Sequence, residues 1–334
     1  AGALDCSELT GRKRGHLASE EEGGVTVSCA GGVRVDCFLP GVKAPLNGEA
    51  GYEISLEGLL GGHSGAEIHK GRASANQVMG RVLYSAMERI PGLRLADIRG
   101  GKFDNVICSR NHARAAVPAD RAEEFEDFIR EFDKALKNEY AGCDGGIALS
   151  CEKTALDKAL SPESTANMLR TLLAVPQGVQ AMNVDFPGLV QTSLNLGVME
   201  LREDGLYFGV SVRSCIATQK DMIVQRLKAI LELGGGSFTL RGNYPGWQYD
   251  RNSALREEVL AAYQAVCGKQ GTIEATHGGL ECGLFVEKLP GLDAVSFGPE
   301  LHDVHSVKER LNVASTQRVY ELTRELLKRE SAAR

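Results

Sequence analysis

The sequence contains no hydrophobic run that approaches the roughly 20 residues that a membrane-spanning helix needs. Its first residues also lack the apolar segment that is typical of a signal peptide. No run of basic residues is present and the formal net charge is −6, so nothing supplies a surface that would neutralise nucleic-acid phosphates. We therefore expect neither a membrane nor a nucleic acid as a partner.

Cysteine pairs in the CxxC pattern are absent as well. The nine cysteines are scattered and odd in number, which is typical of reduced thiols in a reducing compartment, so we expect a cytoplasmic protein. Hydrophobic residues make up 43% and charged residues 25% of the chain. This ordinary globular composition excludes the disordered and fibrous classes and favours small-molecule chemistry.

The length and the order of the expected elements indicate two domains. A chain of 334 residues exceeds the roughly 250–300 residues that one hydrophobic core organises. Residues 40–243 repeat strand and helix patterns, which favours an α+β layer with an antiparallel sheet. Residues 244–334 alternate helices with short apolar strands, which favours a doubly wound α/β sheet. We expect residues 1–39 to join residues 244–334 in that sheet, with 40–243 as an inserted domain.

Local patterns support this division. Amphipathic helices are predicted over residues 73–90 and 120–140. The Glu-Asp-Gly sequence at 203–205 separates two alternating runs and predicts a β-hairpin. Residues 25–38 hold two β-branched runs, which favour either a strand pair or a strand with a tight turn. The sequence NYPGW at 243–247 interrupts the pattern and predicts a hinge.

Two glycine-rich segments follow predicted strands and precede helices. GGHSG at 61–65 is either a plain turn or a platform that delivers His63 to a substrate oxygen. HGGLECG at 277–283 presents free backbone N–H groups, which favour a carboxylate or phosphate, although tight strand-to-helix packing explains these glycines equally well.

Two histidines follow a third apolar strand. GPELHDVHS at 298–306 starts at the end of that strand, where open α/β sheets place their ligands. We interpret His302 as a solvated loop residue, because the HxxH spacing lacks the glutamate of a zinc helix. The position of His305 next to the strand end favours it as a metal ligand. A zinc ion needs three or four ligands, however, and no second ligand is near His305 in the sequence.

Six segments carry a resemblance to a known family: SEEEGGVTVSCAGG, GLLGGHSGAEIHKGRASANQVMGRVL, GGKFDNVI, NYPGW, HGGLECGLF and VSFGPELHDVHS. In this order and spacing the whole chain resembles the aminoacyl-histidine dipeptidases, also called cytosolic non-specific or Xaa-His dipeptidases, which are relatives of carnosinase. The resemblance implies a catalytic domain that holds two zinc ions and is split by an inserted lid domain. It also implies hydrolysis of dipeptides by a metal-bridged water, with a glutamate as general base and metals that polarise the peptide carbonyl.

The resemblance further implies roles for five residues of this chain. His305 occupies the family's last metal-ligand position. His63 and Asn105 match residues that reach the tetrahedral oxyanion after the lid closes. Arg213 falls where an arginine grips the C-terminal carboxylate of the substrate, and Glu281 lies where a side chain meets its amino group.

The departures from the family pattern concern the metal centre. The family's HxD pair, a further aspartate and a Glu-Glu pair belong to a region upstream of Ala1. Ala18 stands at the position of another aspartate ligand, with His16 two residues before it, and Cys108 replaces a proline. Only His305 then remains to hold zinc, or cobalt or manganese in its place, and one imidazole cannot hold a metal ion against water. We expect an incomplete copy of a dipeptidase that is inactive alone and whose partial catalytic sheet exposes an apolar edge.

Two other interpretations stay open at this point. The chain is a non-catalytic binding or interaction protein that keeps the lid and Arg213 and has lost the metals, for which Ala18 argues. Alternatively, residues 40–243 form a lid whose only role is to pair two copies in a homodimer. For the incomplete dipeptidase and for the binding protein, the expected partner is a dipeptide.

Overall fold

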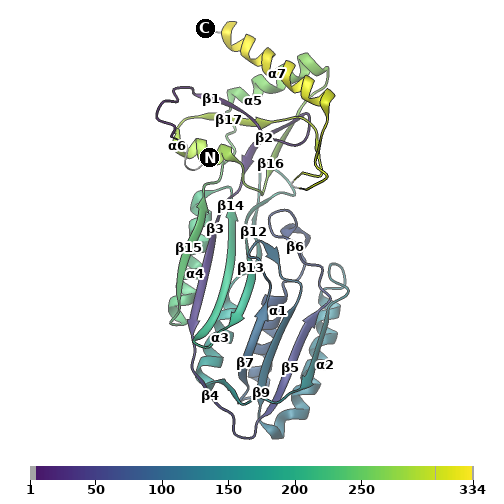
Figure 1. Cartoon of the computed structure of the whole chain (residues 1–334), viewed down its shortest axis with the longest axis vertical. Coiled ribbons are helices and arrows are strands. Elements are labelled where there is room, and N and C mark those ends of the chain that lie inside the picture. The colour runs from purple at the N-terminus through teal and green to yellow at the C-terminus, as the bar shows by residue number, and fades with distance from the viewer. Residues whose placement is uncertain (1–4, 305, 333–334) are drawn as a thin grey trace.

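The computed structural model describes residues 5–304 and 306–332. They form a smaller and a larger part, each built on its own sheet, and both ends of the described chain lie in the smaller part (Figure 1). The protein is therefore a mixed α/β protein. Within these ranges, no helix combines the length and the apolar composition that a bilayer crossing requires.

The smaller part is assembled from the two ends of the chain. Its sheet has the order β1-β17-β2-β16, in which β1 runs parallel to β17, β2 runs parallel to β16, and the central pair is antiparallel. The elements are β1 (Lys13–Leu17), β2 (Gly24–Cys29), α5 (Ala254–Cys267), β16 (Thr272–Thr276), α6 (Glu281–Lys288), β17 (Asp293–Phe297), β18 (Leu301–His302), β19 (Arg310–Leu311) and α7 (Val313–Ala332).

Helices cover both faces of this small sheet. Val295 and Phe297 of β17 pack in one cluster with residues of α5 and α7, whereas Ala294 packs in another cluster with Cys282 of α6. Neighbouring residues of a strand point to opposite faces, so the two clusters lie on opposite sides (Figure 1).

The larger part contains a nine-stranded sheet in the order β10-β5-β9-β7-β13-β14-β3-β15, with β12 also pairing with β13. Its strands are β3 (Gly31–Pro40), β5 (Ala50–Glu57), β7 (Arg94–Gly100), β9 (Asn111–Val117), β10 (Ala148–Lys153), β12 (Gly178–Met182), β13 (Val190–Leu201), β14 (Gly205–Ser214) and β15 (Ser237–Tyr244). Its helices are α1 (Ala75–Arg89), α2 (Ala122–Glu139), α3 (Pro162–Ala174) and α4 (Ala217–Leu233). Short pieces complete it: β4 (Lys43–Pro45), β6 (Gly62–His63), β8 (Val106–Ile107), β11 (Lys158–Leu160) and the 3-10 helices Ile68–Lys70 and Ala119–Arg121.

The large sheet consists of two halves with the same topology. Along the chain, β5-α1-β7-β9-α2-β10 and β3-α3-β13-β14-α4-β15 both follow the order strand, helix, strand, strand, helix, strand. Across the sheet, β10-β5-β9-β7 is continued by β13-β14-β3-β15, which is the same order reversed. β7 and β13 join the halves as antiparallel neighbours. The two halves are thus related by an approximate two-fold axis that passes between these strands.

One face of the large sheet carries the core and the other carries charge. Val35 of β3 and Ile98 of β7 share a buried cluster with Met79 of α1 and Leu227 of α4, and the four helices lie on the same side of the sheet (Figure 1). On the opposite face, charged side chains pair across strands, as Arg114 does with a neighbour on β5. In β3, for example, buried Val33, Val35 and Cys37 alternate with the charged Arg34 and Asp36, so one strand contributes to both faces.

The helices predicted over 73–90 and 120–140 are confirmed as α1 and α2, and the hairpin at 203–205 is confirmed as β13 and β14. The strand pair predicted within 25–38 is wrong: β2 and β3 lie in different sheets, because β3 pairs with β14 and β15. Residues 31–39, which we expected in the smaller part, therefore lie in the larger sheet.

Candidate functional site

The turn that carries His63 lies against the loop that carries Asn105. β6 pairs with β8, and the Ser64 amide donates a hydrogen bond to the Asn105 carbonyl at 2.9 Å. The two glycines before His63 have φ angles of 65° and 133°, which suit glycine. The backbone thereby brings the first two predicted site residues together.

Two carboxylates hold this turn in place. Asp144 is fully buried, and its oxygens accept hydrogen bonds from the Leu60 amide at 2.7 Å and the Ala73 amide at 2.6 Å. Glu67 accepts from the His63 amide at 2.9 Å. Asp144 therefore joins the two ends of the segment 60–73, and Glu67 fixes the backbone of this segment at His63.

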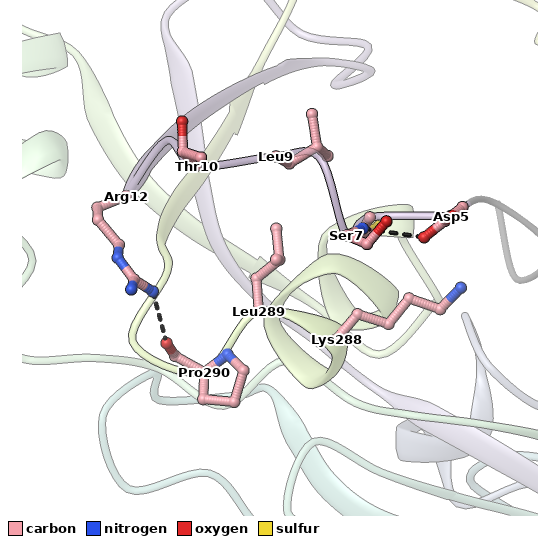
Figure 2. A pocket seen from close by; sticks show the side chains of 9 residues that line it. Asp5, Ser7, Leu9, Thr10, Arg12, Lys288, Leu289 and Pro290 are labelled. Atoms are coloured by element: carbon pink, nitrogen blue, oxygen red, sulfur yellow. Dashed lines mark hydrogen bonds between the residues drawn. The ribbon is translucent and has the colours of Figure 1, made fainter.

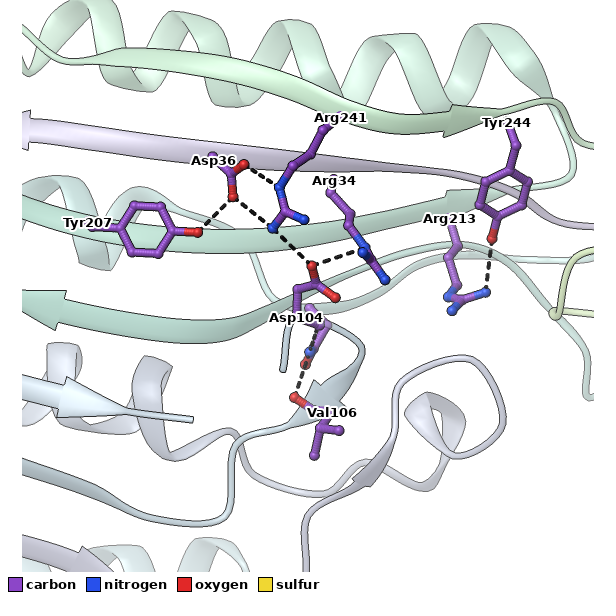
Figure 3. A network of polar contacts seen from close by, with 9 residues as sticks. Arg34, Asp36, Asp104, Val106, Tyr207, Arg213, Arg241 and Tyr244 are labelled. Atoms are coloured by element: carbon purple, nitrogen blue, oxygen red, sulfur yellow. Dashed lines mark hydrogen bonds and ion pairs between the residues drawn. The ribbon is translucent and has the colours of Figure 1, made fainter. Parts of the chain in front are cut away.

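Arg213 approaches the same turn from β14. A Cβ atom placed on Gly65 would lie 2.9 Å from Cε1 of His63 and 3.2 Å from Cζ of Arg213, so Gly65 leaves the space in which the two side chains meet. The guanidinium donates through Nη1 to the Tyr244 hydroxyl at 3.2 Å, and Figure 3 shows this pair apart from the neighbouring network of charges. Arg213 thus faces the site without a carboxylate partner among the residues drawn there.

Asn105 and Arg213 line one cavity of about 270 Å³, together with Tyr244 and Arg34. The lining includes two arginines and no carboxylate, and the volume is close to the lower end of small-molecule sites. A small anionic ligand fits these properties.

Buried polar atoms without a hydrogen-bond partner gather around this place. Of the six such side-chain atoms among the described residues, three are Ser64 Oγ, Arg213 Nε and His277 Nδ1. His277 is buried, and its Nε2 lies 2.8 Å from Ser193 Oγ of β13. A buried polar atom without a partner costs about 1–3 kcal/mol, so the unpartnered Nε of Arg213 beside the cavity is typical of a site that a ligand completes.

Both histidines of the site are kept neutral at pH 7. Burial, and secondly the positive charge of Arg213, lowers the pKa of His277 to about 4. The same two causes lower the pKa of His63. The site therefore presents the guanidinium of Arg213, and that of Arg34 paired with Asp104, beside two uncharged imidazoles.

The loop around Asn105 is clamped to the large sheet (Figure 3). Asp104 forms ion pairs with Arg34 at 3.0 Å and with Arg241 at 3.3 Å. Nδ2 of Asn195 donates to the carbonyls on both sides of Asn105, each at 2.8 Å. No sequence motif signalled this clamp, because its members come from four separate strands and loops.

Glu281 belongs to the smaller part and lies apart from the other predicted residues. Its carboxylate is 3.3 Å from His16 Nε2, at the start of α6. The preceding glycine loop reaches the larger part: a Cβ atom on Gly279 would lie 2.8 Å from the Tyr244 ring. The structure thus brings His63, Asn105 and Arg213 together and connects Glu281 to them through this loop.

Comparisons with known proteins identify the family. Residues 54–143 match the peptidase dimerisation domain. The chain is 37% identical over 313 residues to the cytosol non-specific dipeptidase of Escherichia coli (strain K12), which covers 93% of this chain and 64% of the relative. The chain belongs to the cytosol non-specific, or aminoacylhistidine, dipeptidase family.

A solved member of this family has the same fold over nearly all of the chain. The aminoacylhistidine dipeptidase from Vibrio alginolyticus matches with a TM-score of 0.92 and 31% identity, over 97% of this chain and 66% of that one. The family assignment made from the sequence is confirmed. The chain spans about two thirds of the length of these two relatives.

The described residues do not fit a zinc pair. His305, the predicted metal ligand, lies outside the described residues. Across 5–304 and 306–332, no group of three or more histidine, cysteine, aspartate or glutamate side chains is arranged to hold a metal ion. Ala18 contributes no donor atom where the family pattern has an aspartate.

Another cavity of about 590 Å³ lies between the N-terminal segment and the end of α6 (Figure 2). Arg12 crosses its rim and donates to the Pro290 carbonyl at 3.2 Å. None of the five predicted site residues lines it, so it is distinct from the candidate site.

Proposed function

We propose that this chain binds dipeptides, with the free carboxylate of the ligand on Arg213. The observation that carries the proposal is the state of that guanidinium, whose Nε is buried without a partner and which faces a basic cavity shared with Asn105. A guanidinium forms strong paired hydrogen bonds with a carboxylate. In the complete enzyme we propose hydrolysis of the bound dipeptide with zinc, cobalt or manganese.

His63 and Asn105 are proposed to stabilise the oxyanion. The Ala66 amide donates to Nδ1 of His63 at 3.2 Å. Because Nδ1 accepts and the ring is neutral, its one proton is on Nε2, which is then available as a donor. An uncharged donor held by the backbone suits a carbonyl oxygen that gains charge during the reaction.

We propose that the two parts correspond to a split, doubly wound catalytic domain and an inserted lid. Residues 1–30 and 245–334 would form the first and residues 31–244 the second, with the strand division at Ala30 supporting a boundary earlier than 39. Glu281 would meet the amino group of the ligand and His305 would be a metal ligand. Because the described residues assemble no metal site, the chain alone is proposed to be inactive.

Calorimetric titration without added metal tests the binding proposal. Alanylalanine should bind the chain, whereas its C-terminal amide should bind at least about tenfold more weakly, since a charge-assisted hydrogen bond contributes about 1.5–3 kcal/mol. Arg213→Met should remove the difference between acid and amide. Arg202→Met, which removes a positive charge from the hairpin beyond the cavity, is the control. Equal affinities of acid and amide for the unaltered chain would overturn the proposal.

A second candidate function is peptide binding without catalysis. It uses the same cavity, and the absence of a metal site among the described residues favours it for the chain as given. Hydrolysis assays with zinc, cobalt or manganese separate the two functions, because metal-dependent turnover would contradict the second one.

We also propose that the protein is cytoplasmic and forms a homodimer. The E. coli relative is named a cytosol enzyme, and the eight cysteines from Cys29 onward are free thiols, which supports a reducing compartment. The match to a peptidase dimerisation domain supports a homodimer through the lid. Since β13 already occupies the edge of β7, such a dimer would use another surface of the larger part.

A further inference from the structure

We propose that Tyr244 is a positioning residue that ties Arg213 to the glycine loop before Glu281. In this role it sets the spacing between the groups that hold the carboxylate and the amino end of a dipeptide. The inference rests on the proposed function and adds to it the residue that links the two contacts.

The ring of Tyr244 contacts a glycine from each part of the molecule. A Cβ atom on Gly32 of β3 would lie 2.6 Å from the Tyr244 hydroxyl oxygen, and one on Gly279 would lie 2.8 Å from its Cε2. Neither position leaves room for a side chain. The ring is therefore fitted between the large sheet and the loop that leads to Glu281.

Both ends of Tyr244 are held by hydrogen bonds. Its hydroxyl accepts from Nη1 of Arg213 at 3.2 Å. Its carbonyl accepts from Nζ of Lys220 at 3.0 Å, and the same ammonium donates to the Asn243 side chain at 2.7 Å. Lys220 is buried in α4, and burial lowers its pKa. A buried amine is retained only where its donors are used, so this contact fixes the backbone from which the Tyr244 ring projects.

The Tyr244 hydroxyl restricts the Arg213 side chain but leaves most of its N–H donors available. Arginine has five N–H donors, and Tyr244 engages one of them. The neighbouring charges are engaged with each other, because Arg34 and Arg241 both pair with Asp104 (Figure 3). Arg213 is thus oriented before a ligand arrives, which reduces the entropy that binding would cost.

The loop contact connects this orientation to the other end of the ligand. Gly279 touches the Tyr244 ring, and Glu281 follows two residues later at the start of α6. A shift of Gly279 relative to Tyr244 therefore changes the distance from Glu281 to Arg213. Ligands whose charged ends are separated by one more residue, about 3.3–3.6 Å in an extended chain, should sense that change.

Two substitutions in the full chain test the proposal by calorimetry with alanylalanine, its C-terminal amide and trialanine. Tyr244→Phe keeps the ring and removes the acceptor, so alanylalanine should bind about three- to tenfold more weakly while the amide is unaffected. Gly279→Ala pushes the loop from the ring and should reduce the preference for alanylalanine over trialanine. Gly278→Ala adds the same methyl group near Thr276 instead and should leave both affinities unchanged.

The results that would overturn the role of Tyr244 are distinct from those that would overturn the proposed function. An unchanged affinity in Tyr244→Phe, an equal loss for acid and amide, or a further loss when Tyr244→Phe is added to Arg213→Met would each refute the positioning role. Failure of the unaltered chain to distinguish acid from amide would refute the proposed function instead. In that case the NMR signal of the Arg213 Nε–H still decides the orientation: it should exchange with water faster in Tyr244→Phe, and an unchanged signal refutes the inference.

Discussion

His277 connects protonation to the stability of the folded chain. Its imidazole is buried, bonds to Ser193 of the larger part and has a pKa of about 4, with Arg213 and His69 as the nearby groups that oppose a positive charge. A histidine has a pKa of about 6.5 when unfolded. Between these two values the unfolded chain takes up a proton that the folded chain does not, so the free energy of unfolding should fall as the pH falls.

Lowering the pH from 7 to 4 should reduce the stability of the unaltered chain by up to about 3 kcal/mol more than that of His277→Asn, which has a polar side chain that does not titrate. Urea unfolding at several pH values measures the difference, and the variant removes the common contribution of the carboxylates. Parallel stability curves for the two proteins would contradict the prediction.

At the scale of single residues, the sequence predicts site residues that match a family motif and misses contacts between residues from distant strands. His63 and Asn105 lie in two of the quoted segments and Arg213 matches an arginine of the family, and the structure places the three close together, although their roles stay predictions. Asp104 and Tyr244 lie in two of the quoted segments, yet the sequence indicated no role for either side chain. The arginines that their side chains contact lie more than 30 residues away along the chain, and only the folded sheet brings them together.

At the scale of elements, the turn that presents His63 depends on one buried carboxylate. Asp144 accepts hydrogen bonds from the amides of Leu60 and Ala73, which lie at the two ends of the turn segment. Removing both acceptor oxygens leaves two amides without partners in a place that water does not reach. Segments with few remaining contacts open locally before the rest of a protein unfolds.

We predict that Asp144→Ala loosens residues 60–73. The expected cost is about 2–4 kcal/mol, and trypsin should cleave after Lys70 or Arg72 faster than in the unaltered chain. Mass spectrometry of timed digests identifies the cleavage site. The control is Asp157→Ala, since Asp157 is exposed and contributes its backbone carbonyl, which the substitution retains. Equal cleavage rates in the two variants would show that Asp144 does not anchor the turn.

Elements with local signals were predictable, and those that depend on pairing were not. The periodicity of α2 and the Glu-Asp-Gly turn between β13 and β14 depend on neighbouring residues, so the sequence was sufficient for both. β2 and β3 follow each other with only Ala30 between them, yet each pairs with strands far along the chain. Which sheet a strand joins is decided by those partners and not by its own residues.

At the scale of the whole molecule, residues 185–186, here called the strap, connect the larger part to the smaller one. Phe186, from the loop between β12 and β13, packs edge-on against Tyr249 with ring centroids 5.1 Å apart. Next to it, Asp185 pairs with Arg251 at 2.8 Å. Both rings also pack against the hydrophobic cluster of the smaller part, so this loop of the larger part is fixed to the core of the smaller one.

We predict that Phe186→Ala weakens the junction between the parts. The aromatic contact and its buried area should contribute about 1–2 kcal/mol. Trp247 is the single tryptophan and is buried at the junction beside Cys29, so its fluorescence reports the change as a lower urea midpoint. Val184→Ala is the control, because Val184 belongs to the same loop and is 82% exposed. A midpoint that does not move would show that the strap is not needed.

The paired halves of the large sheet have a consequence for how this protein can vary. In an assembly of two identical subunits, every substitution is made twice, and a change that helps one copy is imposed on the other. Here the two halves belong to one chain, in which the half from β5 to β10 is inserted between β3 and α3 of the other, and each can change alone. The half with β5 to β10 carries His63 and Asn105, while the other carries Arg213 on β14. The two halves thus share one topology but carry different site residues, which two identical subunits could not do.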